Sequence, residues 1–210
     1  MNSEKTTNLT LVPNGPCIVK NLKSLSNVKG AIDVGETTAL CRCGASTNKP
    51  FCDGSHEKIK FLSDKSDDRL EDKKQTYIGN NITIYDNRSL CAHAGYCTDN
   101  LSAVFRMKQE PWVNADAATA EDIIETIKKC PSGALSYSVN VNESGANNTS
   151  TIMVAPNGPY VVSGRIELTN TTWGSGASKE QFTLCRCGAS KNKPFCDGSH
   201  WEIKFTDDKN

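Results

Sequence analysis

Nine of the ten cysteines and all three histidines of this chain fall in three short motifs. Two of the motifs share one spacing: Cys-x-Cys, then eight residues, Cys, three residues and His. Their candidate metal ligands are Cys41, Cys43, Cys52 and His56 in the first copy and Cys185, Cys187, Cys196 and His200 in the second. Thiolates and imidazoles bind soft and borderline metal ions. Because the last Cys and the His are four residues apart, both can face one point. The spacing therefore predicts two metal sites, each with three thiolates and one imidazole.

The spacing alone leaves the metal open. Three cysteines and one histidine form a standard structural zinc set, but zinc sites more often have about two to four residues between the first two ligands. Here a single residue stands between them. A disulfide framework is the other alternative. Residues 1–10 are polar and contain no apolar core of a secretion signal, so free thiols in a reducing, cytoplasmic compartment are expected.

The full pattern is more specific than the ligand spacing. Cys-x-Cys-x2-Ser-x3-Pro-x-Cys-Asp-Gly-Ser-His occurs twice, with Ser46 and Ser190 as the serines and Pro50 and Pro194 as the prolines. It resembles the CDGSH iron–sulfur domain of the NEET proteins at every motif position. The resemblance implies one [2Fe–2S] cluster in each copy, held by its three cysteines and its histidine. A neutral imidazole in place of a thiolate should raise the reduction potential of such a cluster.

The third motif lies between the two copies and contains Cys91, Cys97 and, far downstream, Cys130. Cys91 and Cys97 have the outer spacing of the bacterial ferredoxin run Cys-x2-Cys-x2-Cys, but Ala94 stands at its second position. Pro131 follows Cys130, as in the remote Cys-Pro of that fold. The segment 77–137 resembles the divergent single-cluster 4Fe–4S ferredoxin domain.

Three cysteines leave one corner of a cubane cluster without its usual ligand. The resemblance therefore implies either a [3Fe–4S] cluster or a [4Fe–4S] cluster with a fourth ligand from elsewhere. His93 is the nearest candidate, one residue before the missing cysteine. A hydrogen bond to a ligand and simple exposure are the alternatives for His93. A zinc ion held by the three cysteines and His93 also remains open.

An internal repeat organises the chain. Residues 12–19 read VPNGPCIV and residues 155–162 read APNGPYVV, and both copies end in Ile-Lys-Phe. Cys17 stands where the second copy has Tyr160, so we expect Cys17 to be a strand residue and not a ligand. Short strands are predicted at 17–19 and 38–40 and at the matching positions 160–162 and 182–184.

The segment between the copies reads as a domain of its own. Residues 77–85 predict a β-hairpin around Gly79-Asn80-Asn81. An apolar stripe at 120, 123, 124 and 127 predicts a helix, which Thr119 can cap with Asp122.

We therefore expect an α+β fold with two small β-rich CDGSH domains and a small ferredoxin-like α+β domain. Single-motif NEET proteins resemble one another in pairing as dimers, so the two copies are expected to pair within this chain. The predicted parts are the first CDGSH domain at 9–62, a charged linker at 63–76, the ferredoxin-like domain at 77–139, a polar linker at 140–150 and the second CDGSH domain at 151–206.

Two further residue types in the repeats admit different roles. Arg42 and Arg186 lie between the first two ligands and either offset cluster charge or are solvated. Asp53 and Asp197 precede glycine and are expected to cap the turn that presents the histidine rather than to act in catalysis.

Composition disfavours several classes of function. Twenty-four basic and 24 acidic residues give a net charge of zero, which disfavours nucleic acid as a partner. No apolar run approaches the roughly 20 residues of a membrane span, and no nucleotide-binding loop or acid–base pair indicates an enzyme. We expect electron transfer or redox response with a redox partner protein. The alternative is cluster storage, transfer or sensing with an apo-protein acceptor, and the weaker one is a structural zinc scaffold.

Overall fold

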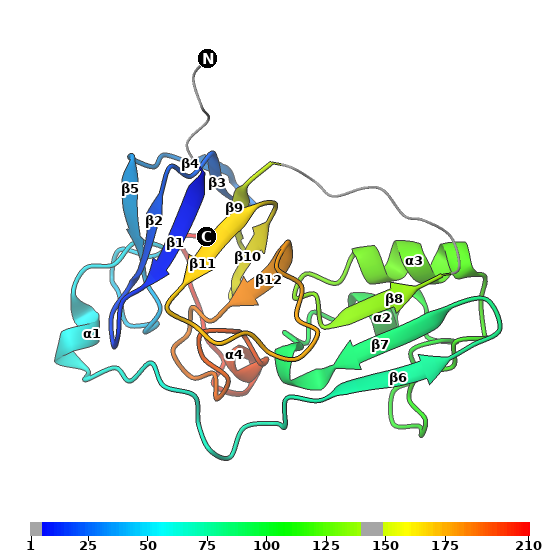
Figure 1. Cartoon of the computed structure of the whole chain (residues 1–210). Coiled ribbons are helices and arrows are strands. Elements are labelled where there is room, and N and C mark those ends of the chain that lie inside the picture. The colour runs from blue at the N-terminus through cyan, green and yellow to red at the C-terminus, as the bar shows by residue number, and fades with distance from the viewer. Residues whose placement is uncertain (1–5, 140–148) are drawn as a thin grey trace.

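The computed structural model describes residues 6–139 and 149–210. The polar linker predicted at 140–150 lies, apart from its last two residues, outside the described residues. The fold is α+β, with three small sheets and short helices (Figure 1). Below, the first repeat is residues 9–62, the second repeat is residues 151–206, and the middle domain is the segment between them from Lys74 to Val139.

The first sheet combines strands of both repeats. β1 (Thr7–Leu11), β2 (Cys17–Lys20) and β5 (Thr37–Leu40) form an antiparallel set in the first repeat. The fourth strand, β11 (Ile166–Thr169), belongs to the second repeat and pairs in parallel with β1.

The second sheet makes the reciprocal exchange. β9 (Thr151–Val154), β10 (Tyr160–Ser163) and β12 (Gln181–Leu184) come from the second repeat. β3 (Ser24–Asn27) of the first repeat pairs in parallel with β9, and β4 (Gly30–Ile32) completes the edge. The two repeats are thus paired within one chain, as the repeat predicts.

Alternating side chains of these strands fill one core between the two sheets. β1 alternates buried and partly buried residues, and its Leu9 and Leu11 pack in one cluster with Val154 and Val162 of the second repeat. Cys17 is a buried member of this cluster. Its place in β2 and its burial confirm that Cys17 is a core residue of a strand, and the burial raises the pKa of its thiol.

The middle domain has its own antiparallel sheet of β6 (Lys74–Ile78), β7 (Thr83–Asn87) and β8 (Leu135–Ser138). β6 and β7 form the predicted hairpin. β6 begins three residues before the expected domain start at 77, so the end of the charged segment 63–76 is strand and not linker.

Two helices and one 3-10 turn complete the middle domain: η1 (Arg88–Leu90), α2 (Tyr96–Asn100) and α3 (Ala120–Lys128). The predicted cap of α3 is present, because the side chain of Thr119 accepts a hydrogen bond from the backbone N–H of Asp122 at 3.2 Å. Each repeat ends in a one-turn helix, α1 (Ser55–Lys58) or α4 (Ser199–Glu202).

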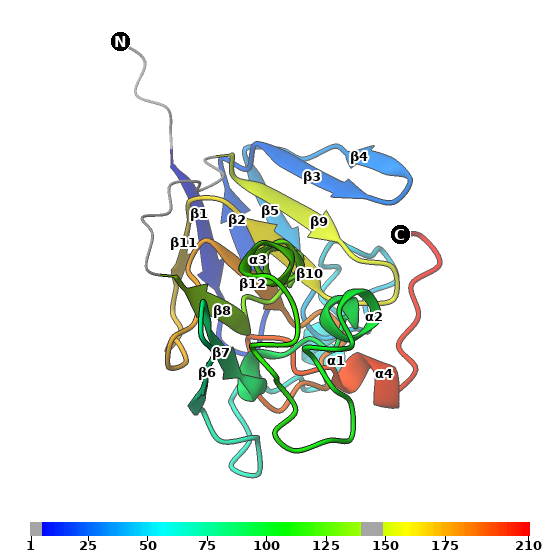
Figure 2. The same ribbon diagram turned by 90° about the vertical axis from the view of Figure 1, so that its right-hand side faces the viewer.

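The middle domain packs on the second repeat and not symmetrically between the two. Figures 1 and 2 show β8 and α3 beside β12, with β1, β2 and β5 on the far side. Leu90 and Ala134 of the middle domain belong to the core cluster of the paired repeats. The side chain of Gln181 donates a hydrogen bond to the carbonyl of Cys130 at 2.8 Å. The middle domain therefore packs against the second repeat.

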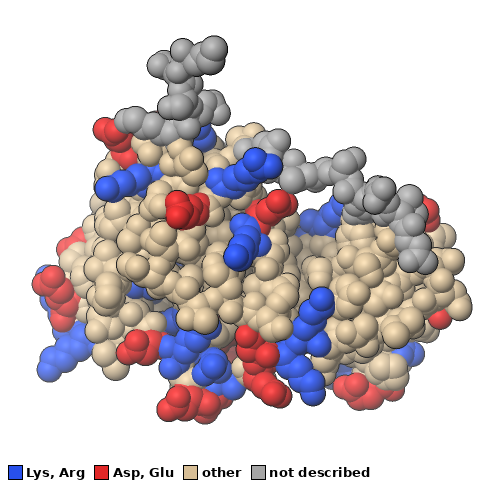
Figure 3. Space-filling view, in the orientation of Figure 1, with Lys and Arg blue, Asp and Glu red and all other residues tan. Residues whose placement is uncertain are grey.

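Acidic and basic side chains are interspersed on the face shown in Figure 3, in keeping with the net charge of zero. Within the described ranges, none of the helices combines the length and apolar character that crossing a bilayer requires.

Candidate metal centres

The first Cys3His set is held by a loop that begins where β5 ends. The backbone N–H of Cys41 donates to the carbonyl of Pro50 at 2.8 Å, and that of Cys52 donates to the carbonyl of Ala39 at 2.8 Å. These bonds bring the start and the end of the loop together. The Sγ atoms of Cys41 and Cys43 are 3.7 Å apart, and Sγ of Cys52 is 3.4 Å from Nδ1 of His56.

The second Cys3His set repeats this geometry. The N–H groups of Cys185 and Cys196 donate to the carbonyls of Pro194 and Thr183 at 2.8 and 3.1 Å. The Sγ atoms of Cys185 and Cys187 are 3.8 Å apart, and Sγ of Cys196 is 3.4 Å from Nδ1 of His200. Each set thus consists of a thiol–thiol pair and a thiol–imidazole pair.

The distances within the pairs suit chelation of a metal ion. Two ligands of one tetrahedral ion with bonds of about 2.0–2.3 Å lie roughly 3.3–3.8 Å apart. Both kinds of pair fall near this range. In the part of the chain that the structure describes, no three or more His, Cys, Asp and Glu side chains lie close enough together to hold one metal ion. The donors of each Cys3His set therefore form two separate pairs.

The two pairs of each set lie close enough for charge on one to affect a thiol of the other. Charge on Cys52 contributes to raising the pKa of Cys43, after its hydrogen bond with Cys41 and its burial. The hydrogen bond from Cys43 lowers the pKa of Cys41 to about 6. In the second set the corresponding hydrogen bond lowers the pKa of Cys187. One thiol of each Cys-x-Cys pair is therefore prone to ionise, which favours metal binding because the thiolate is the ligand.

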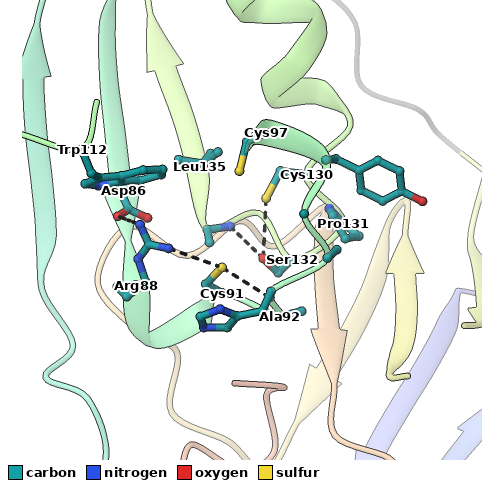
Figure 4. A pocket seen from close by; sticks show the side chains of 15 residues that line it. Asp86, Arg88, Cys91, Ala92, Cys97, Trp112, Cys130, Pro131, Ser132 and Leu135 are labelled. Atoms are coloured by element: carbon teal, nitrogen blue, oxygen red, sulfur yellow. Dashed lines mark hydrogen bonds and ion pairs between the residues drawn. The ribbon is translucent and has the colours of Figure 1, made fainter. Parts of the chain in front are cut away.

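The middle set is formed by Cys91, Cys97 and Cys130, which line one pocket (Figure 4). Cys91 follows η1, Cys97 lies in α2, and Cys130 stands two residues beyond α3. In Figure 4 the sulfur atoms of Cys97 and Cys130 point toward one another. Burial raises the pKa of Cys97 to about 11, with added effects from charge on Cys91 and Cys130. The three cysteines thus line the same pocket, and their role as ligands of one cluster stays a prediction.

Comparison with known proteins agrees with this architecture. Residues 14–57 and 157–201 match the family described as iron-binding zinc finger, CDGSH type, and residues 77–140 match the family described as divergent 4Fe-4S mono-cluster. The chain belongs to the CDGSH iron–sulfur family, with two CDGSH units flanking a divergent 4Fe–4S domain.

Two curated relatives are similar to part of this CDGSH protein. Both are called "Uncharacterized protein YjdI", from Escherichia coli strain K12 and from Escherichia coli O157:H7. Each is 34% identical over 68 residues, which is 32% of this chain and 90% of the relative. The families make this chain an iron–sulfur-binding protein.

The aspartates of the CDGSH motifs hold the ligand loop, as predicted. Oδ2 of Asp53 accepts hydrogen bonds from the N–H and the hydroxyl of Thr47, at 2.8 and 2.9 Å. Its Oδ1 accepts from the N–H of Ser55 at 3.0 Å. Asp197 repeats two of these bonds, to the N–H groups of Lys191 and Ser199. Each aspartate therefore ties the loop to the turn that presents the histidine.

The arginines between the first two ligands are not solvated, which excludes one of the two predicted roles. Arg42 and Arg186 are 4% and 1% exposed. Arg42 donates to the carbonyls of Gly15 and Val12 at 2.9 and 2.6 Å. Arg186 donates to the equivalent carbonyls of the Pro-Asn-Gly-Pro turn in its own repeat. Both guanidinium groups therefore anchor that turn beneath the ligand loop.

Sequence reasoning missed the charged group beside the middle set. Nη1 of Arg88 lies 4.0 Å from Sγ of Cys91, and Nη2 lies 3.3 Å from Oδ2 of Asp86. The guanidinium carbon lies 4.1 Å from the centre of the Trp112 ring, and Figure 4 shows this stack. No motif marks Arg88 in the sequence, because its place beside Cys91 depends on the turn η1.

His93 has a contact that the sequence does not indicate. Its backbone N–H donates to Sγ of Cys91 at 3.4 Å, while its ring lies against Gly198 of the second CDGSH motif. Ligation of the middle cluster by His93 stays a prediction.

Proposed function

We propose that this CDGSH iron–sulfur protein carries electrons and does not convert a substrate. A [2Fe–2S] cluster in each Cys3His set and a [3Fe–4S] or [4Fe–4S] cluster in the middle set are the proposed cofactors. The observation that carries the proposal is the division of each Cys3His set into two chelating pairs, which provides two ligands for each of two irons. Such clusters supply one-electron redox chemistry with potentials set by ligands, net charge and solvent exposure.

The protein side chains support this role by excluding water and by placing charge. Burial raises the pKa of Cys196, and charge on Cys185, Asp197 and Cys91 adds to this effect. Cys91 belongs to the middle set, and the ring of His93 beside it lies against Gly198 of the second motif, so the middle and second sites are neighbours. Closely spaced sites are what an electron carrier with several clusters requires.

Cluster storage, transfer or sensing is the second candidate, and the exposure of the first Cys3His set favours it. Cys52 and His56 are both partly exposed, whereas their counterparts in the second repeat are buried. A partly exposed imidazole ligand is open to solvent and to the approach of a partner protein. An apo-protein acceptor could therefore reach the first set.

Metal and sulfide analysis of anaerobically purified protein, together with EPR, tests the proposed cofactors. The expected content is about seven irons per chain with a [3Fe–4S] cluster, or about eight with a [4Fe–4S] cluster. A colourless preparation with about three zinc ions and no iron would instead support a structural zinc scaffold.

A second measurement separates the two redox roles. Reversible reduction in a redox titration, with all iron retained, is expected of an electron carrier. Transfer of iron and sulfide to an apo-ferredoxin within minutes near neutral pH would favour storage and transfer and would contradict the proposal.

A further inference from the structure

The two Cys3His sets have the same sequence pattern but different surroundings. In the second repeat Cys196 is 3% exposed and His200 is 5% exposed. Cys52 and His56, their counterparts in the first repeat, are partly exposed. The difference extends through the motif, since Gly198 is buried and Gly54 is not. The ligand loops are near copies up to the histidine; after it Trp201, whose ring centre lies 5.1 Å from that of His200, takes the place of Glu57. Cys196 and Gly198 precede the histidine, and their burial points to contacts from outside the repeat.

His93 of the middle domain is one source of the difference. It adopts a left-handed backbone conformation, with φ of 54°, directly after the turn that carries Cys91. A β-carbon placed on Gly198 would lie only 2.6 Å from Cδ2 of His93. A β-carbon placed on Gly54 would meet nothing within 4 Å. The ring of His93 therefore covers the glycine that precedes Ser199 and His200, although His93 remains exposed on its other side.

A buried hydrogen bond adds a second contact between the same parts. The side-chain N–H of Asn192 donates to the carbonyl of Ser89 at 2.7 Å, across 103 positions of the sequence. Asn192 is 4% exposed, whereas Asn48, its counterpart in the first repeat, is exposed. Ser89 and His93 flank Cys91, so one short segment of the middle domain makes both contacts.

We propose that the segment from Ser89 to His93 shields the Cys196–His200 pair of the second Cys3His set from solvent, with His93 as the residue that covers it. The Cys-x-Cys pair does not share this difference, since Cys187 is partly exposed and Cys43 is buried. The first set is then the one that exchanges its metal with a chelator or an acceptor protein. This inference rests on the proposed function in one respect, that both sets hold metal. It assigns different roles to two sites that the sequence makes alike.

The test follows loss of metal from each set separately. The metal-loaded full chain is treated anaerobically with excess EDTA in the presence of iodoacetamide, and alkylated cysteines are identified by mass spectrometry. The peptides of the two motifs differ after the histidine, where one has Glu57 and the other Trp201. We expect Cys52 to be alkylated about tenfold faster than Cys196, the size of effect that one or two interdomain contacts provide.

Two glycine substitutions provide matched variants. Gly54 and Gly198 have nearly equal φ values of 85° and 89°, so alanine imposes the same backbone strain at each. Only at Gly198 does the new methyl group meet His93. G198A is expected to accelerate alkylation of Cys196 by more than G54A accelerates alkylation of Cys52.

A variant of His93, combined with G198A, completes a double-mutant cycle. Glycine at position 93 tolerates the positive φ and removes the ring. H93G is expected to accelerate alkylation of Cys196 several-fold and to leave the rate at Cys52 unchanged. When G198A is added to H93G, the further acceleration at Cys196 should be no larger than the acceleration that G54A causes at Cys52. Alkylation of Cys91 and Cys97 is followed in the same samples.

The outcomes separate the alternatives. Equal alkylation rates for Cys52 and Cys196 in the unmodified protein would overturn the inference. An H93G effect confined to Cys91 and Cys97 would also overturn it, and would indicate that His93 is a ligand of the middle cluster. A preparation without iron or sulfide contradicts the proposed function instead, and the alkylation rates still test closure if zinc fills the sets.

Discussion

The hydroxyl of Tyr160, in the second repeat, lies 2.8 Å from the carbonyl oxygen of Cys41, in the first. It also lies 2.9 Å from the carbonyl oxygen of Pro50, so it can donate a hydrogen bond to either. Tyr160 is 1% exposed. A core residue of one repeat therefore supports the backbone of a candidate metal ligand in the other, whereas the equivalent position of the first repeat, Cys17, carries only a short thiol, which is a weak donor.

Tyr160→Phe should destabilise the paired repeats. Removal of the hydroxyl leaves the buried carbonyl of Cys41 without this donor, at a cost of about 1–2 kcal/mol. For a protein of this size that corresponds to a fall of about 3–6 °C in the apparent midpoint of thermal unfolding. Tyr85→Phe is the control, since the hydroxyl of Tyr85 bonds to Ser138 in an exposed position. Equal midpoints for the two variants would contradict the role of Tyr160.

Gly44→Ala and Gly188→Ala should disrupt the contact between the two ligand loops. A β-carbon on Gly44 would lie 2.3 Å from the carbonyl oxygen of Cys187, and one on Gly188 would lie 2.5 Å from that of Cys43. Because the contacts are reciprocal, both variants should lose similar stability, about 1–3 kcal/mol more than Gly54→Ala.

Thermal unfolding of the three glycine variants checks this expectation, and light scattering reports whether the chain then associates with another copy. A loss in Gly44→Ala no larger than in Gly54→Ala would show that the loops are not in contact.

Much of the site could be predicted from sequence because the ligand pattern is local. The spacing of Cys52 and His56 places both on one turn, and Asp53 caps that turn within the same motif. The helix after Thr119 is likewise fixed by nearby residues. Pairing of the repeats could be inferred from the resemblance, because single-motif NEET proteins resemble one another in pairing as dimers and this chain carries two copies.

The difference between the two Cys3His sets could not be predicted, because it arises from contacts across long sequence separations. Ser89 and Asn192 carry no mark of their contact in the sequence. The sequence leaves the choice between a charge-offsetting and a solvated role of Arg42 and Arg186 open for the same reason, since their acceptors are carbonyls of a turn nearly 30 residues earlier.

Asp207→Ser should lower the stability of the protein. The loss should be larger than the effect of a substitution at Ser63, the counterpart of Asp207 in the first repeat. Asp207 forms an ion pair with Arg186, and both side chains are almost fully buried. The backbone N–H groups of Ser63 and Asp207 make equivalent bonds to Asn14 and Asn157, which identifies the two positions as counterparts. Loss of a partner from a buried pair costs about 3 kcal/mol.

Ser63→Asp is the reciprocal variant, and it should stabilise by about 1 kcal/mol or less, because Arg42 already has two carbonyl acceptors. Thermal unfolding measures both. If Ser63→Asp stabilised the protein by as much as Asp207→Ser destabilises it, the special contribution of the buried Arg186–Asp207 pair would be contradicted.

The effect of Asp207→Ser should not vary between neutral and mildly alkaline pH. Burial alone would raise the pKa of Asp207, but hydrogen bonds from Asn210 and Arg186 outweigh it and hold the pKa below its usual value. A carboxylate with a lowered pKa contributes stability above its unfolded pKa of about 4 and loses it as the pH falls through the folded value. The difference between Asp207→Ser and the unmodified protein should therefore be constant from about pH 6 to 9 and shrink only in acid.

Arg88→Gln should lower the reduction potential of the middle cluster. Arg88 places a positive charge 4.0 Å from Sγ of Cys91, and removing it makes reduction of the cluster less favourable. Its side chain is 39% exposed, so solvent weakens the effect to a shift on the order of 50 mV. Arg88→Lys keeps the charge and should restore most of the potential. Lys20→Gln, on β2 at the side away from the middle sheet (Figure 1), removes an equal charge and should leave the middle cluster unaffected.

An EPR-monitored redox titration measures the shift, and the state of Asp86 decides the conditions. Burial raises the pKa of Asp86, and the charge of Arg88 counteracts this effect. Without Arg88 the carboxyl takes up a proton more readily, and that proton would replace the lost positive charge. The titration is therefore made at about pH 8, where uptake of that proton is less favoured than at lower pH and the negative shift is better expressed. A potential that is unchanged at this pH in Arg88→Gln, or that moves equally in Lys20→Gln, would show that Arg88 does not act on the middle site.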